Sequence, residues 1–171
     1  MTFIPYGRQD INQTDIDAVV DVLKSDFITQ GPAVPAFEQA IADYTRSQFC
    51  IAVNSATSAL HLACMALGVA SGDTVWTSPI TFVASANCAR YCGADVDFVD
   101  IDPDTFNLCP VKLRDKLKKH AAEELPLPKV VIAVHMAGQS CAMKQIHALS
   151  LEYGFRIIED ASHAIGGRYL N

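Results

Sequence analysis

Short β-type runs alternate with helical runs of about ten or more residues from residue 49 onward. Strands separated by helices of that length are joined by crossover connections, which place neighbouring strands parallel to one another. The alternation therefore predicts an α/β fold with a mainly parallel sheet flanked by helices. The expected strands are residues 49–53, 74–77, 96–101, 130–135 and 156–159, and the expected helices are residues 55–67, 81–91, 111–124 and 142–153.

The first part of the chain has helical patterns without β-type runs between them. Residues 14–26 have the apolar spacing of a helix, and Thr14 is the expected N-cap. Gly31 and Pro32 interrupt that pattern, and a second helical pattern continues to Tyr44. We expect two helices before the alternation begins.

Composition and charge exclude several classes of protein. Hydrophobic residues make up 50% of the chain and charged residues 19%, which is typical of a globular protein. The formal charge is −6 and no basic run is present, which argues against a nucleic-acid partner. No apolar stretch approaches the ~20 residues that cross a bilayer. Residues 1–10 lack the features of a secretory signal, so we expect a cytoplasmic protein without membrane contact.

The six cysteines do not predict disulfides or a metal site. A reducing compartment disfavours disulfides. No C-x-x-C pair is present, so a zinc site has little support. Cys88 and Cys92 are four residues apart in a helical pattern, and we expect them to pack as small apolar side chains.

One candidate binding motif directly follows the first expected strand. Ligands of parallel sheets bind outside the carboxyl ends of the strands, so a motif at this position is a candidate for ligand binding. Ser55, Thr57 and Ser58 offer hydroxyl groups at the start of a helix, and Ala56 lets a ligand approach the backbone. The unpaired N–H groups of the helix start add a positive field that suits a phosphate. The alternative is an ordinary Ser/Thr N-cap, and this motif taken by itself favours the N-cap. Neither G-x-G-x-x-G nor G-x-x-x-x-G-K-[ST] occurs, so dinucleotide and P-loop sites lack their main support.

Three further strand ends carry candidate groups. Asp160 is suited to a cationic ligand nitrogen and His163 to a neighbouring oxygen; the alternatives for Asp160 are a cap on the next turn or a magnesium-binding strand. Phe82, which follows Pro79, can stack on a planar ring, although a single phenylalanine is more often part of a core. His135 either reaches the same cleft or is a hydrogen-bonded structural histidine.

Together these strand ends offer a phosphate cradle, a ring-stacking aromatic side chain, a carboxylate and an oxygen partner. Pyridoxal phosphate (PLP) needs that set. A carboxylate against the pyridine nitrogen keeps it protonated, which lets the ring accept electrons from a substrate carbanion. The sequence therefore predicts a PLP site at the carboxyl edge of the sheet.

Five segments carry a family resemblance, and they span nearly the whole chain. They are Thr29-Gln-Gly-Pro32, Asn54-Ser-Ala-Thr-Ser-Ala-Leu-His61, Thr81-Phe-Val-Ala-Ser-Ala-Asn87, Val99-Asp-Ile-Asp-Pro-Asp104 and Glu159-Asp-Ala-Ser-His163. In this order they resemble the DegT/DnrJ/EryC1/StrS sugar aminotransferases, a branch of the type I (aspartate aminotransferase) fold. Features of the pseudaminic-acid branch of that family are Ser55-Ala-Thr57, Trp76-Thr-Ser-Pro79, Asn87-Cys88, Tyr91-Cys-Gly93 and His163.

The resemblance implies a role for each candidate cofactor-binding residue. Ala56 and Thr57 would hold the cofactor phosphate, and Phe82 would stack on the ring. Asp160 would pair with the ring nitrogen, and His163 would lie near the phenolic oxygen.

The resemblance also implies a substrate and an assembly. Members of the pseudaminic-acid branch move an amino group from glutamate to a UDP-linked 4-keto-6-deoxy-N-acetylhexosamine, and family members are homodimers. The alternatives are another keto-sugar nucleotide as substrate, or a truncated remnant without catalysis. The residues that match the substrate-contacting segments of this branch are Tyr6, Asp26, Phe27, Ile28, Thr29 and Ala56.

No catalytic residue is expected within the chain. The family's Schiff-base lysine follows the Asp160 motif by a few tens of residues, which places it beyond Asn171, and none of the seven lysines has the family's Ser-x-x-Lys setting. We therefore expect the N-terminal part of the large domain, with an N-terminal arm at about residues 1–31. The rest of the large domain and the small C-terminal domain would be absent.

Overall fold

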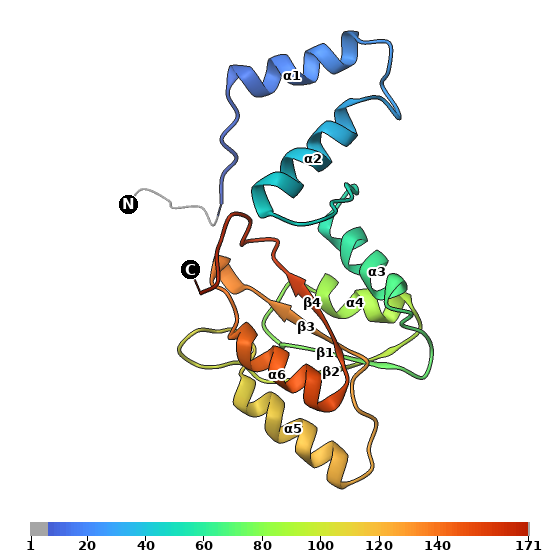
Figure 1. The fold of residues 1–171 in the computed structure, drawn as a ribbon, viewed down its shortest axis with the longest axis vertical. Helices are drawn as coiled ribbons and strands as arrows, with labels where there is room; N and C mark the ends of the chain where they lie inside the picture. Colours follow the sequence, from blue (N-terminus) through green and yellow to red (C-terminus); the bar gives the residue numbers. More distant parts are fainter. Residues whose placement is uncertain (1–6, 171) are drawn as a thin grey trace. The chain divides into compact units, whose positions relative to one another are not determined.

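The computed structural model describes residues 7–170, which divide into two compact units with the boundary between Ala52 and Val53 (Figure 1). The first unit contains α1 (Gln13–Lys24) and α2 (Ala33–Thr45). The second unit contains the sheet and the remaining helices. Each unit is described by itself. Within residues 7–170, no helix combines the length and apolarity needed to cross a membrane.

Helix α1 begins at a capping box whose N-cap residue lies two residues before the predicted N-cap. The side-chain oxygen of Asn12 accepts the backbone N–H of Thr14 at 2.8 Å. In return, the carboxylate of Asp15 accepts the backbone N–H of Asn12 at 2.9 Å. The prediction of Thr14 as N-cap was wrong, because Asn12 satisfies the free N–H groups of the first turn in its place.

Four parallel strands form the sheet of the second unit in the order β2-β1-β3-β4. The predicted α/β fold with a parallel sheet is therefore confirmed. The strands are β1 (Thr74–Thr77), β2 (Asp95–Phe98), β3 (Val130–Val134) and β4 (Arg156–Asp160). The helices of this unit are α3 (Ala56–Ala66), α4 (Ala84–Tyr91), α5 (Pro110–Ala122), α6 (Met143–Tyr153) and the short η1 (Met136–Gly138).

The expected strand at residues 49–53 does not form. Phe49 and Ile51 are 79% and 80% exposed, so this apolar run buries neither of its large side chains within the described residues. Its hydrogen bond goes to a helix, because the backbone N–H of Ala52 donates to the carboxylate of Glu38 in α2 at 2.7 Å. A β-type run becomes a strand only where a neighbouring strand and a packing surface receive it.

The sheet separates two layers of helices, with α3 and α4 on one face and α5 and α6 on the other (Figure 1). Side chains of a strand alternate between the two faces. In β3, Ile132 and Val134 pack in the core of the α3/α4 face, whereas Val131 and Ala133 pack in the core of the α5/α6 face. A strand buried on both faces reads as a continuous apolar run, as this one does.

The same alternation divides the two acidic residues that end β4. Ile158 belongs to the core of the α3/α4 face, so Asp160, two residues later, faces the same layer. Ile157 packs against the core of the α5/α6 face, so Glu159 faces that layer. The neighbouring carboxylates therefore lie on opposite sides of the sheet.

The loop after β3 lies against the loop after β4 at Gly138. This glycine has φ +89°, and a Cβ atom built on it would lie 2.9 Å from the backbone oxygen of His163. Both the backbone conformation and the close approach require a residue without a side chain.

We expect Gly138→Ala to destabilise the protein by at least about 2 kcal/mol, because the added methyl must displace the backbone at His163 as well as adopt a left-handed conformation. Gly154→Ala is the matched control, since Gly154 has φ +78° with nothing within 4 Å of a built Cβ. That control should cost about 1 kcal/mol. Urea denaturation of the three proteins measures the difference, and equal losses in both variants would show that the contact with His163 is unimportant.

Candidate cofactor site

The connections of the sheet change direction between β1 and β3. From β1 the chain moves to β2 on one side and later to β3 and β4 on the other. Crevices at such switch points bind ligands in open α/β sheets. Three candidate residues follow strands at this edge of the sheet: Phe82 comes after β1, and Asp160 and His163 come at and after the end of β4.

The start of α3 is capped, as the alternative interpretation of this motif predicted. The side-chain oxygen of Ser55 accepts the backbone N–H of Ser58 at 3.2 Å. The hydroxyl of Ser58 donates to the side-chain oxygen of Asn54 at 2.7 Å. The first N–H groups of a helix have no partner within the helix, and here they belong to Ala56 and Thr57. The cap therefore leaves two backbone donors that fit an anion such as phosphate.

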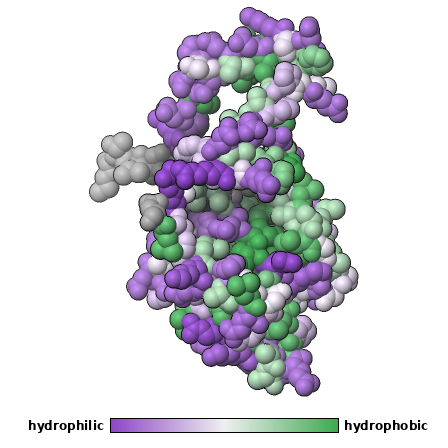
Figure 2. Space-filling model, in the orientation of Figure 1, coloured by the Kyte–Doolittle hydropathy of each residue, from purple (hydrophilic) through white to green (hydrophobic). Residues whose placement is uncertain are grey.

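Phe82 is not a core residue. Its side chain is 73% exposed, and it lies in the loop between β1 and α4. Figure 2 shows hydrophobic residues gathered on the surface over α3 and α4. The core alternative for Phe82 was therefore wrong, and an aromatic face is available beside the carboxyl edge of the sheet.

Asp160 is 8% exposed and accepts hydrogen bonds on both carboxylate oxygens. The hydroxyl of Ser85, in α4, donates to Oδ2 at 2.9 Å. The hydroxyl and backbone N–H of Ser162 donate to Oδ1 at 2.6 Å and 3.2 Å. The alternative interpretation of Asp160 as a cap on the following turn is thus confirmed through Ser162. Ser85 connects that same carboxylate to the helix that follows Phe82.

Sequence reasoning missed Ser85. It lies in one of the segments that carry the family resemblance, but a single serine in a helical pattern does not show what it contacts. The only available signal was its period, since Ser85 lies on the helix face that also carries the buried Cys88 and Ala89.

His135 is a structural histidine on the opposite face of the sheet. Its Nδ1 accepts the backbone N–H of Cys141 at 3.1 Å, and its Nε2 lies 2.8 Å from a carboxylate oxygen of Glu159. The interpretation in which His135 reaches the cleft of Asp160 was wrong, because its partner Glu159 faces the α5/α6 layer. The hydrogen bond from His135 holds the pKa of Glu159 below its ordinary value.

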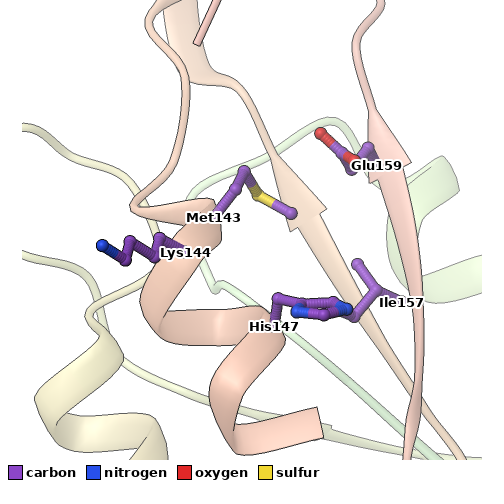
Figure 3. Close-up of a pocket in the computed structure, with 5 residues that line it drawn as sticks. All are labelled: Met143, Lys144, His147, Ile157 and Glu159. Carbon is purple, nitrogen blue, oxygen red and sulfur yellow. The ribbon is translucent and has the colours of Figure 1, made fainter. Parts of the chain in front are cut away.

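A hollow of about 390 Å³ also lies on this opposite face (Figure 3). It is bounded by α6 and β4, and Figure 3 shows the side chain of Lys144 pointing away from Glu159. Its lining residues are Met143, Lys144, His147, Ile157 and Glu159. Because Glu159 and Asp160 face different layers, this hollow is separate from the candidate cofactor site.

Lys129 lies at the amino end of β3, away from the candidate site. Its ammonium group donates to the backbone oxygen of Gly68 at 2.6 Å and to the carboxylate of Asp73 at 2.8 Å. This agrees with the expectation that Lys129 starts a strand at the wrong end of the sheet to reach a cofactor.

The other predicted residues are placed separately. His163 is exposed in the turn after β4. Asp26, Phe27, Ile28 and Thr29 lie in the first unit, where Phe27 and Ile28 are 57% and 76% exposed. Tyr6 lies outside the described residues. The substrate-binding roles of these residues stay predictions.

Parallel strands between two helical layers are shared with the type I fold of PLP-dependent enzymes, to which the solved structures that resemble this chain belong. Residues 9–171 match the DegT/DnrJ/EryC1/StrS aminotransferase family, and the chain belongs to that family.

Two curated relatives are equally similar in sequence. The spore coat polysaccharide biosynthesis protein SpsC of Bacillus subtilis is 40% identical over 98% of this chain and 41% of the relative. The UDP-4-amino-4,6-dideoxy-N-acetyl-beta-L-altrosamine transaminase of Campylobacter jejuni is 40% identical over 97% of this chain and 43% of the relative. The chain therefore spans about two-fifths of the length of these relatives.

A solved structure shows the same fold. It is a protein of Streptococcus pneumoniae described as a sugar aminotransferase, in its PLP form. The TM-score is 0.83 at 30% identity, over 95% of this chain and 44% of the other.

We expect Glu159→Gln to reduce stability at neutral pH and to have little effect in acid. A carboxyl group whose pKa is lowered on folding stabilises the protein above its unfolded value, here 4.5, and that contribution is lost as the pH falls through the lower folded value. Urea denaturation at about pH 7 and about pH 3 measures the difference. Glu123→Gln, at the exposed end of α5, controls for the loss of one charge. An equal effect of Glu159→Gln at both pH values would show that the charge is not what holds the pair.

Proposed function

We propose that this chain provides the cofactor-binding edge of a PLP-dependent sugar-nucleotide aminotransferase in the cytoplasm. The carboxylate of Asp160 is the observation that carries the proposal. It is buried, three donors reach its oxygens, and it lies on the sheet face that α3 and α4 cover. A carboxylate fixed in place by these donors is the partner that a protonated pyridine nitrogen requires.

Each cofactor-binding residue has one role at this edge. The N–H groups of Ala56 and Thr57 bind the phosphate, and the exposed ring of Phe82 orients the cofactor ring by stacking on it. Asp160 holds a proton at the ring nitrogen, and His163 binds the phenolic oxygen. When bound, PLP supplies a ring that accepts electrons from the substrate carbon.

The proposed substrate is a UDP-linked 4-keto-6-deoxy-N-acetylhexosamine, with glutamate as amino donor. The identity of 40% to the Campylobacter jejuni transaminase supports this class. The equal identity to the spore coat polysaccharide protein supports a second candidate, a different keto-sugar nucleotide. A panel of UDP- and dTDP-linked keto sugars, assayed with glutamate and the full-length gene product, separates the two.

We further propose that the chain is the N-terminal part of a larger homodimeric enzyme, with an N-terminal arm at about residues 1–31. Its coverage of 41% and 43% of the curated relatives supports a larger enzyme; the homodimer and the arm follow from the family resemblance. The gene sequence after the codon of Asn171 is the direct test. We expect an open reading frame that reaches a Ser-x-x-Lys motif, and a stop codon directly after Asn171 would favour a remnant without catalysis.

The cofactor site is tested by binding of pyridoxamine 5′-phosphate to the chain in equilibrium dialysis. This form of the cofactor has an amine in place of the aldehyde, so it does not react with the seven lysines. We expect Asp160→Asn to weaken binding by about tenfold, because a charge-assisted hydrogen bond is lost. Phe82→Ala should weaken binding by about threefold or more, because ring stacking is lost.

Phe106→Ala is the matched control for Phe82→Ala. Phe106 is also exposed, at 52%, but it lies in the loop between β2 and α5. Equal affinities of the wild-type protein and the Asp160 and Phe82 variants would contradict the proposed site.

A further inference from the structure

We infer that Ser85 is a positioning residue that sets the orientation of the Asp160 carboxylate toward the cofactor ring nitrogen. The inference rests on the proposed function and extends it to a side chain to which no role has been given. Ser85 is fully buried, and its hydroxyl lies 2.9 Å from Oδ2 of Asp160. This bond spans 75 positions in the sequence and joins α4 to the end of β4.

The direction of the hydrogen bonds follows from the chemistry of the groups. An ionised carboxylate only accepts, so the single hydroxyl hydrogen of Ser85 points to Asp160. The hydroxyl oxygens of Thr81 and Ser85 are 2.9 Å apart. Because the hydrogen of Ser85 is already used, Thr81 donates to Ser85. The result is a relay from Thr81 through Ser85 to the carboxylate, and Thr81 directly precedes Phe82 in the chain.

The two oxygens of Asp160 are not equally engaged. Within residues 7–170, Oδ1 accepts two hydrogen bonds, both from Ser162, and Oδ2 accepts one, from Ser85. Each carboxylate oxygen offers about two acceptor positions. The remaining position is therefore on Oδ2, next to the hydroxyl of Ser85. A ring N–H is the donor that would complete it, and Ser85 determines where that position points.

The experiment compares the binding of two ligands, pyridoxamine 5′-phosphate and its analogue with C–H in place of the ring nitrogen. The ratio of their affinities reports only the contact at the ring nitrogen. A purely structural defect weakens both ligands equally and leaves the ratio unchanged. We expect Ser85→Ala to reduce the ratio by about threefold to tenfold, since the charge-assisted bond to Asp160 is lost.

Two further variants act as controls. Ser85→Thr keeps the hydroxyl and should keep most of the ratio, which also covers the case in which Ser85→Ala fails to fold. Ser150→Ala removes another buried hydroxyl, one that donates to the backbone oxygen of His147 within α6 on the opposite face. It should leave the ratio unchanged.

The outcomes separate the inference from the proposed function. If Asp160→Asn abolishes the preference for the ring nitrogen but Ser85→Ala retains it, the positioning role of Ser85 is wrong and the cofactor site stands. If the wild-type protein binds neither ligand, or shows no preference between them, the proposed cofactor site is itself wrong. A reduced ratio in Ser85→Ala with a normal ratio in Ser150→Ala supports the inference.

Discussion

The oxygens of a buried carboxylate require hydrogen-bond donors, and this requirement at Asp160 organises the edge of the sheet. Ser85 reaches it from α4 and Ser162 from the following turn. The backbone oxygen of Asp160 also accepts the N–H of His135 at 3.0 Å, which joins the ends of β3 and β4. One residue therefore connects a helix, a turn and a neighbouring strand, and each of them limits where its carboxylate can point.

The alternation of side chains along β4 gives its two neighbouring acidic residues different roles. Glu159 faces the α5/α6 layer and accepts a hydrogen bond from Nε2 of the buried His135. Asp160 faces the α3/α4 layer, which also contains the capped start of α3 and the helix α4 that follows Phe82. Because Glu159 and Asp160 are adjacent in one strand, the contact of Glu159 with His135 also restrains the backbone that carries Asp160. The pair on one face thus supports the site on the other.

Much of this fold follows from the sequence, and the exceptions have physical causes. Periodicity predicts β3 and α6 well because each buries a continuous apolar face. Sequence patterning fails at residues 49–53, where an apolar run is present but no strand pairs with it. It also cannot reveal Ser85, whose importance depends on a partner 75 positions away. Asn107 was missed for the same reason: its side chain accepts the N–H of Met136 at 2.9 Å across the carboxyl edge.

At this edge, a local structural role and a ligand-binding role are compatible for the same group. Ser55 caps α3 by taking the N–H of Ser58, and this leaves the donors of Ala56 and Thr57 for an anion. Asp160 caps the next turn with Oδ1, and this leaves Oδ2 with capacity for a further donor. A backbone whose own polar groups are already satisfied holds its remaining donors and acceptors in fixed positions. The local contacts that argue for a merely structural role therefore also preorganise the groups that would bind the cofactor.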